Sequence, residues 1–88
     1  MNRSETNDPA TIALQALVWT LGEPARADRL LAVTGLGADD LRASAGSHAT
    51  LSALLGFLES HEPDLIACAA DLDIKPEALV VARRSLDA

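Results

Sequence analysis

The stretch that decides the fold is Ile12–Leu21, which reads Ile-Ala-Leu-Gln-Ala-Leu-Val-Trp-Thr-Leu. Only Gln15 and Thr20 interrupt its apolar residues, and Trp19 is the single tryptophan of the chain. On a helix, these apolar side chains cover most of the circumference and do not form one narrow stripe. We therefore expect this helix at the centre of the domain, with other helices packed on several of its sides.

The composition favours one small all-α domain. The chain has 88 residues, enough for one domain and too few for two. Leu and Ala, both strong helix formers, dominate an apolar content of 49%, whereas aromatic residues make up only 2%. We expect a compact bundle of five to six short helices over residues 8–88, preceded by a flexible N-terminus over residues 1–7.

Proline, acidic residues and glycine mark the ends of the expected helices. An acidic N-cap followed by proline is a typical helix start, and it occurs early in the chain at Asp8-Pro9 and Glu23-Pro24. Later helices are expected to begin near Ala38, Ser47, Glu62 and Pro76. Gly22 is expected to end the first helix as a left-handed cap, and Gly35 is expected to cap the second helix.

The clearest amphipathic pattern lies between Ser47 and Ser60. Four leucines there occupy positions i, i+3, i+4 and i+7, namely Leu51, Leu54, Leu55 and Leu58. This helix is expected to cross Ile12–Leu21 at the centre of the bundle. By the same reasoning, Val33 and Ile66 are assigned to the inner faces of the helices that contain them.

The order of the motifs also suggests two three-helix halves, over roughly residues 8–45 and 46–86. A shift of 38 residues aligns Trp19 with Phe57, the only two aromatic residues. Each half alone is too small to bury its apolar face, so the two halves should share one core. The alternative is that small helical bundles share such spacings by chance.

Four motifs, taken in order, resemble one known family. They are Ala13-Leu14-Gln15-Ala16-Leu17-Val18-Trp19, Glu23-Pro24, Leu31-Ala32-Val33-Thr34-Gly35-Leu36 with Leu41-Arg42 after it, and Pro76-Glu77-Ala78. In these motifs the chain is similar to the short bacterial proteins of the domain of unknown function 3572 family. It departs from the family at Gly37-Ala38, where members usually have an acid and a proline, and over His48–Phe57, where members tend to be richer in aromatic and acidic residues. The resemblance implies a small all-helical domain and no activity, because it carries no catalytic or binding residues.

No group of residues has the spacing of a catalytic, cofactor-binding or metal site. His48 and His61 are the only imidazoles and lie thirteen positions apart, so they cannot share a metal ion within one chain. The acidic run that starts at Asp71 lacks the glycine and the glutamate of an EF-hand at the required positions. Cys68 lies among apolar residues and is interpreted as a buried, unreactive thiol. We therefore expect no enzyme activity, no cofactor and no bound metal.

Cysteine use and the N-terminal sequence favour a cytoplasmic protein. Cys68 is the only cysteine, so no internal disulfide can form, which fits a reducing compartment. Residues 1–9 make a poor signal peptide, because they contain acidic residues and no small-residue cleavage site follows. The apolar run of Ile12–Leu21 spans about half of a bilayer core, so no membrane association is expected.

The charge of the chain disfavours nucleic-acid binding. Its net charge is −6 and its seven basic residues are spread along the sequence, whereas binding to a phosphate backbone needs a cluster of Lys and Arg. A divergent helix-turn-helix regulator stays as the alternative function, with Arg26, Arg29 and Arg42 as its contacts. Its recognition helix would be Ala38–Ala45, whose first turn carries two aspartates that would repel phosphates.

The remaining function class is a small non-enzymatic domain for protein–protein interaction, such as an adaptor. A domain of this size need not cover all sides of so apolar a helix, and an apolar patch left exposed would be a partner site. The candidate interaction face consists of Leu14, Val18, Trp19 and Leu21. The partner would be another protein or a second copy in a homodimer. The alternative is that the other helices cover this face completely.

Overall fold

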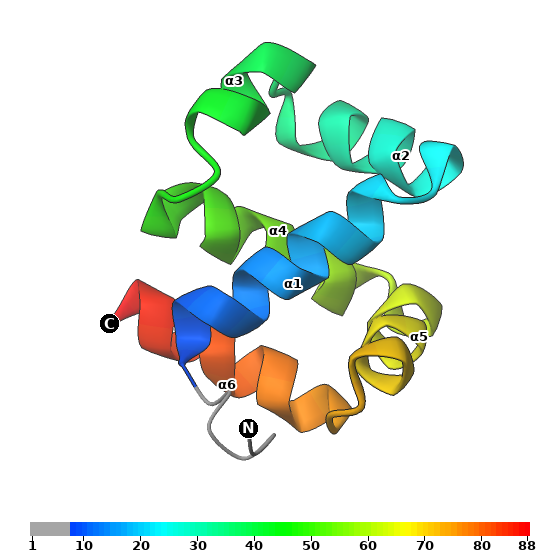
Figure 1. Cartoon of the computed structure of the whole chain (residues 1–88), viewed down its shortest axis with the longest axis vertical. Coiled ribbons are helices and arrows are strands. Elements are labelled where there is room, and N and C mark those ends of the chain that lie inside the picture. Colours follow the sequence, from blue (N-terminus) through cyan, green and yellow to red (C-terminus); the bar gives the residue numbers. More distant parts are fainter. Residues whose placement is uncertain (1–7) are drawn as a thin grey trace.

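Helices account for most of the part of the chain that the structure describes. The computed structural model describes residues 8–88, and within this range the backbone forms six helices and no β-strand. In chain order they are α1 (Pro9–Leu21), α2 (Pro24–Thr34), α3 (Ala38–Ala43), α4 (His48–Ser60), α5 (Glu62–Leu72) and α6 (Pro76–Asp87) (Figure 1). The all-α bundle expected from the sequence is confirmed. The flexible N-terminus expected over residues 1–7 lies outside the described residues.

The starts of α1 and α2 follow the acid–proline signals. The Asp8 carboxylate accepts a hydrogen bond from the backbone N–H of Thr11 at 2.9 Å. The Glu23 carboxylate accepts one from the N–H of Ala25 at 2.8 Å. Each carboxylate thereby satisfies a first-turn donor that has no partner within its own helix. Both caps are therefore encoded locally, in the residue that precedes the helix.

The two glycines that follow α1 and α2 differ in conformation. Gly35 caps α2, as expected, and is left-handed with a φ of 73°. Gly22 also caps α1, but the expectation that it is left-handed is wrong, because its φ of −72° and ψ of −11° continue the right-handed helical conformation. The chain turns one residue later, at Glu23, which is extended with a φ of −124° and a ψ of 116°. Pro24 disfavours the helical conformation in the residue before it, so the proline and not the glycine sets the end of α1.

The hydrophobic core lies where α1, α4 and α6 pack against one another. These three helices make the most extensive contacts of the fold, and Figure 1 shows α1 crossing α4 with α6 beside it. The four leucines of the α4 stripe are at most 1% exposed: Leu51, Leu54, Leu55 and Leu58. Leu79, Ala82 and Leu86 bring α6 into the same core. The expected crossing of α1 with α4 is thus present, and α6 completes the core as a third helix.

Two apolar residues that the sequence assigned to inner faces lie at the surface. Val33 on α2 is 61% exposed and Ile66 on α5 is 52% exposed, so both assignments are wrong. α2 contributes only Leu30 to the buried core, because it packs at the edge of the bundle (Figure 1). On α5, Cys68 is fully buried. It lies two positions from Ile66 and therefore about 200° around the helix.

The two proposed halves are not equivalent in structure. α3 has six residues, whereas α6, its counterpart at the end of the second half, has twelve. Trp19 on α1 is half-buried, whereas Phe57 at the matching position of α4 is 2% exposed. The halves share one core, as expected. Their origin by duplication stays a hypothesis.

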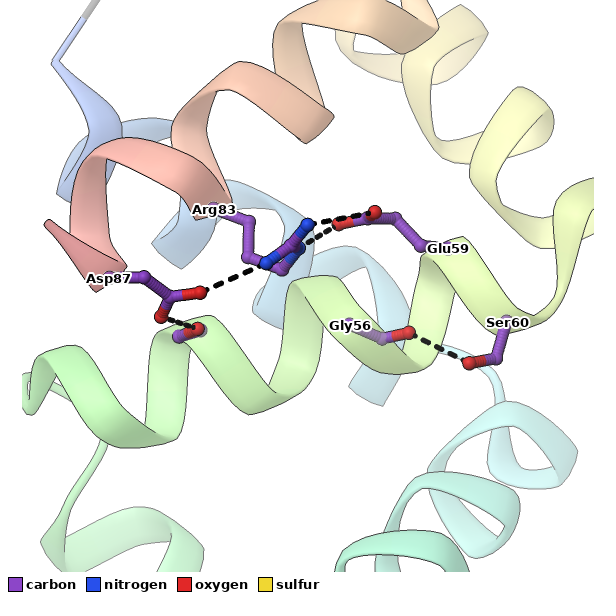
Figure 2. Close-up of polar contacts among 6 residues, drawn as sticks. Gly56, Glu59, Ser60, Arg83 and Asp87 are labelled. Atoms are coloured by element: carbon purple, nitrogen blue, oxygen red, sulfur yellow. Dashed lines mark hydrogen bonds and ion pairs between the residues drawn. The ribbon is translucent and has the colours of Figure 1, made fainter.

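A cluster of hydrogen bonds and ion pairs connects α6 to α4 beside this core (Figure 2). The guanidinium of Arg83 donates to Glu59 on α4 and, at 2.9 Å, to Asp87 on its own helix. The hydroxyl of Ser52 on α4 donates to the same Asp87 carboxylate. Hydrogen bonding to Glu59 and the charge of that carboxylate raise the pKa of Arg83. Arg83 and Asp87, which lie one turn apart on α6, thus contact Glu59 and Ser52, which lie two turns apart on α4. These contacts favour one rotational position of α6 relative to α4.

Candidate functional site

One face of α1 is left uncovered by the rest of the described chain. Leu14 is 40% exposed, Val18 69% and Leu21 43%, and Thr11 is exposed one turn before them. Their spacing of three, four and three residues is that of the a and d positions of a coiled coil. We call this line of four side chains (Thr11, Leu14, Val18 and Leu21) the α1 seam. The opposite face of α1 is buried in the core, so the seam is held on a fixed helix.

The α1 seam is uncharged along its length and acidic at both ends. No ionisable side chain occurs in α1 itself. At one end, the Asp8 carboxylate accepts a hydrogen bond from the hydroxyl of Thr11 at 3.0 Å. At the other end, Glu23 is exposed two residues after Leu21. The seam is thus an apolar strip between two carboxylates.

Trp19, the fourth residue of the predicted interaction face, lies on the flank of the α1 seam. Its side chain is half-buried, and its indole N–H donates to the Asp71 carboxylate of α5 at 2.6 Å. The guanidinium of Arg26 covers the ring at 3.6 Å from its centroid. The other three predicted residues lie at the surface on one line: Leu14, Val18 and Leu21. The structure thus brings three of the four together and holds Trp19 in an internal contact.

Arg26 joins α2 to the end of α1, a contact that the sequence reasoning missed. Its Nη2 donates to the backbone carbonyl of Trp19 at 2.8 Å. A cation in the last turn of a helix also interacts favourably with the helix dipole. The Nε of Arg26 is buried and has no hydrogen-bond partner in the described part of the chain. The only sequence signal for this contact is the spacing of seven residues across the short break between the two helices.

Cys68 lies in the interior and is unsuited to nucleophilic chemistry. Its side chain is fully buried. Burial raises the pKa of the Cys68 thiol to about 12, and the nearby charge of Arg26 opposes this only in part. Because the thiolate is the reactive form of cysteine, this thiol is inert near neutral pH, as the sequence indicated.

A shallow apolar groove with a volume of about 480 Å³ lies between α2 and α4. Val33, Leu36 and Phe57 contribute to its walls, and no ionisable side chain lines it. The three hydroxyl groups in its lining each donate a hydrogen bond within the chain. The groove therefore presents no group that could act in catalysis or bind a charged ligand.

The three arginines named for a helix-turn-helix all have partners within the chain. Arg26 is stacked on Trp19, as described above. Arg29 forms an ion pair with Asp64 at 2.8 Å, and Arg42 forms one with Asp39 at 3.1 Å. The helix that would enter the groove of DNA, α3, has only six residues and begins with two aspartates. This geometry adds no support to nucleic-acid binding.

The histidines are separated as the sequence indicated. His48 begins α4, and His61 follows its last residue. The ring of His61 packs against Phe57 with the ring centroids 5.0 Å apart. Within residues 8–88, no group of three or more His, Cys, Asp or Glu side chains is placed to hold a metal ion.

These features define the class: a small all-α domain whose distinguishing surface is an uncharged apolar seam on its central helix. A family model described as protein of unknown function (DUF3572) matches residues 6–88. The chain therefore belongs to this family, as its motifs indicated. Comparison with curated proteins and comparison with solved structures give no match. Across residues 8–88, no helix has the length and apolar character needed to cross a membrane.

Proposed function

We propose that this protein is a non-enzymatic interaction domain that binds a helix of a partner protein along the α1 seam. The observation that carries the proposal is the line of three large apolar side chains, Leu14, Val18 and Leu21, exposed at coiled-coil spacing. Single exposed apolar side chains are common on soluble proteins, whereas a contiguous apolar strip is typical of an interaction site. An amphipathic helix laid along such a strip is a recurrent mode of recognition.

The rigidity of α1 supports this role. The face opposite the seam packs into the core through Ile12, Ala16 and Leu17, each at most 5% exposed. The C-terminal turn of α1 is held by Arg26, which contacts both the ring and the carbonyl of Trp19. A surface that is ordered before binding loses little conformational freedom when a partner docks. The seam is therefore suited to recognise a helix without rearrangement.

The competing functions have less support. Nucleic-acid binding would use Arg26, Arg29 and Arg42, and each guanidinium already has a partner within the chain. An enzyme would need convergent polar groups, whereas the α2–α4 groove is lined by apolar and hydrogen-bonded hydroxyl side chains. A cytoplasmic site of action is part of the proposal, because the single cysteine is a free thiol.

A pair of matched valine substitutions tests the proposal. Val18 in the seam is 69% exposed, and Val81 on α6 is 56% exposed. Val18→Glu and Val81→Glu therefore add the same charge at similarly exposed positions, one inside the seam and one outside it. Tagged versions of each variant and of the wild type would be expressed in the native cell, and the proteins that they capture would be compared.

The expected result is a protein captured by the wild type and by Val81→Glu and lost by Val18→Glu. That protein, once purified, should bind the domain directly and should slow amide hydrogen exchange in α1. Circular dichroism and urea unfolding establish that both variants fold. The proposal fails if no captured protein distinguishes Val18→Glu from Val81→Glu, or if the purified protein leaves exchange in α1 unchanged.

A further inference from the structure

We infer that the segment bound along the α1 seam is a basic amphipathic helix, with an apolar stripe and a lysine or arginine near each end. This inference rests on the function proposed above and specifies the chemistry of the partner. The observation that carries it is the placement of Asp8 and Glu23, one at each end of an otherwise uncharged strip.

The two carboxylates are available to a partner. In the described part of the chain, neither Asp8 nor Glu23 takes part in an ion pair. Both are exposed, and each is used only as a hydrogen-bond acceptor at the start of a helix. A carboxylate can accept several hydrogen bonds, so capping leaves room for a cation. A lysine or arginine of the partner would therefore form an ion pair with Asp8 or Glu23 that the described part of the domain does not supply.

The flank of the seam adds to this acidity. The exposed Asp71 carboxylate accepts the indole N–H of Trp19 beside the seam. Arg26, the cation nearest to Trp19, is half-buried and has its guanidinium stacked on the indole ring. The guanidinium of Arg26 is therefore stacked on Trp19, whereas the Asp71 side chain is exposed to solvent. The whole chain also has a net charge of −6, which attracts a basic segment at long range.

The length of the seam sets the spacing of the partner's charges. Asp8 directly precedes α1 and Glu23 follows it by two residues, so the two residues flank a helix of 13 residues, which is about 20 Å long. A partner helix that matches this span carries its apolar residues over about two heptads, with basic residues about four turns apart. Basic residues at those two points would meet Asp8 and Glu23 at the ends of the strip.

A second copy of the chain fits this site less well. Antiparallel pairing of two α1 helices would place Asp8 of each copy next to Glu23 of the other. Parallel pairing would place Asp8 next to Asp8 and Glu23 next to Glu23. Either arrangement brings like charges together at both ends and adds the repulsion between two molecules of net charge −6. Charge therefore favours a basic partner over a homodimer.

The test uses charge removal that keeps the caps. Asn caps a helix about as well as Asp, and Gln retains the side-chain oxygen that accepts from the N–H of Ala25. The double variant Asp8→Asn/Glu23→Gln thus removes both charges and leaves the apolar seam intact. Its probes are three helical peptides with leucine at a and d positions over two heptads and with Lys, Gln or Glu at both ends. Binding would be measured by calorimetry at 0.05 M and 0.5 M salt.

The Lys peptide should bind the wild type most tightly and the Glu peptide least. The double variant should bind the Lys peptide about tenfold more weakly at low salt, and 0.5 M salt should remove most of this difference, because exposed charge pairs are weak and screened. Val18→Glu should abolish binding of all three peptides. Equal binding of the Lys and Glu peptides by the wild type would overturn the inference.

The native partner separates this inference from the proposed function. If a partner that depends on Val18 binds the double variant as tightly as the wild type, the charge inference fails and the interaction seam stands. If sedimentation shows a dimer that Val18→Glu dissociates, the occupant is a second copy and the inference of a basic helix is overturned. If Val18→Glu changes binding of none of these molecules, both proposals fail.

Discussion

The guanidinium of Arg26 lies 3.6 Å from the centre of the Trp19 ring, and its Nη2 donates to the carbonyl of the same residue at 2.8 Å. One side chain from α2 thus covers the aromatic ring of α1 and satisfies a carbonyl in the last turn of that helix. The indole N–H is held in turn by Asp71 on α5. Trp19 is therefore the point at which three helices are joined.

Removal of this contact should destabilise the domain. Arg26→Ala should lower the free energy of unfolding by about 2 kcal/mol, because it removes a partly desolvated cation–π contact and a charged hydrogen bond. Arg26→Lys should lower it by about half as much, because it keeps the charge without the planar stack. Urea unfolding followed by circular dichroism measures both values.

Arg84→Ala serves as the control, because Arg84 is an exposed arginine on α6 and its loss should change stability by less than about 0.5 kcal/mol. If Arg26→Ala were as stable as Arg84→Ala, the stack on Trp19 would contribute nothing to the fold.

The two glycines at the ends of α1 and α2 should respond to alanine with opposite signs. Gly35→Ala should cost about 1 kcal/mol, because the φ of 73° is left-handed and strained for a residue with a Cβ. Gly22→Ala should be neutral or stabilising by about 0.5 kcal/mol, since its φ of −72° suits alanine. The added Cβ at Gly22 would lie 3.4 Å from the carbonyl oxygen of Trp19, at the edge of ordinary contact. Thermal and urea unfolding of the two variants would reveal the sign of each effect.

Two neighbouring apolar positions of α1 should differ in their contribution to stability. Leu17 is 3% exposed and Leu14 is 40% exposed. Leu17→Ala should lower the free energy of unfolding by about 3 kcal/mol, because it leaves a cavity in the core. Leu14→Ala should cost less than about 1 kcal/mol, because much of its side chain is already in water. Comparable losses in the two variants would show that the α1 seam is covered in solution.

Ionisation of the Cys68 thiol should lower the free energy of unfolding at alkaline pH. Burial raises the pKa of its thiol from 9.0 to about 12, so the folded state favours the neutral thiol more than the unfolded state does. The contribution of the neutral thiol to the free energy of unfolding is complete below pH 9 and is lost as the pH rises toward 12. Between pH 8 and pH 10.5, the wild type should therefore lose more stability than Cys68→Ala, which has no thiol to ionise. Equal losses in the two proteins would mean that the thiol is not buried in solution.

Chemical labelling provides a second measurement on the same thiol. At pH 8, a disulfide reagent should modify folded Cys68 at least about a hundredfold more slowly than the urea-unfolded chain, because reaction requires an exposed thiolate. Rapid labelling of the folded protein would contradict the burial of Cys68.

Features that depend on neighbouring residues could be read from the sequence. The Asp8 cap depends on a residue three positions away, and the α4 leucine stripe depends only on helical periodicity. Val33 and Ile66 were assigned to the wrong faces, because their exposure depends on which helices pack against them. The left-handed assignment of Gly22 failed because a proline two residues later sets the turn.

Three of the four residues of the α1 seam, Leu14, Val18 and Leu21, were predicted from the sequence as part of an interaction face, together with Trp19. The seam's spacing of three, four and three residues is present in the printed sequence, but apolar residues on the other faces of α1 give the helix no distinct stripe. The packing of the other helices against α1 was needed to show that Thr11 lies on the same exposed face and that Trp19 is half-buried beside it. The hydrogen bond between Trp19 and Asp71 could not be predicted from local sequence, because the two residues are 52 positions apart.

The position of the only tryptophan gives the protein an internal optical probe. Trp19 follows Val18 directly and is half-buried beneath Arg26, so a helix docked on the seam would change the solvent around the indole. With a single tryptophan, the ultraviolet emission of the chain comes from this one site. Occupancy of the seam can therefore be followed in the unmodified protein, without a dye and without knowing in advance which partner is present.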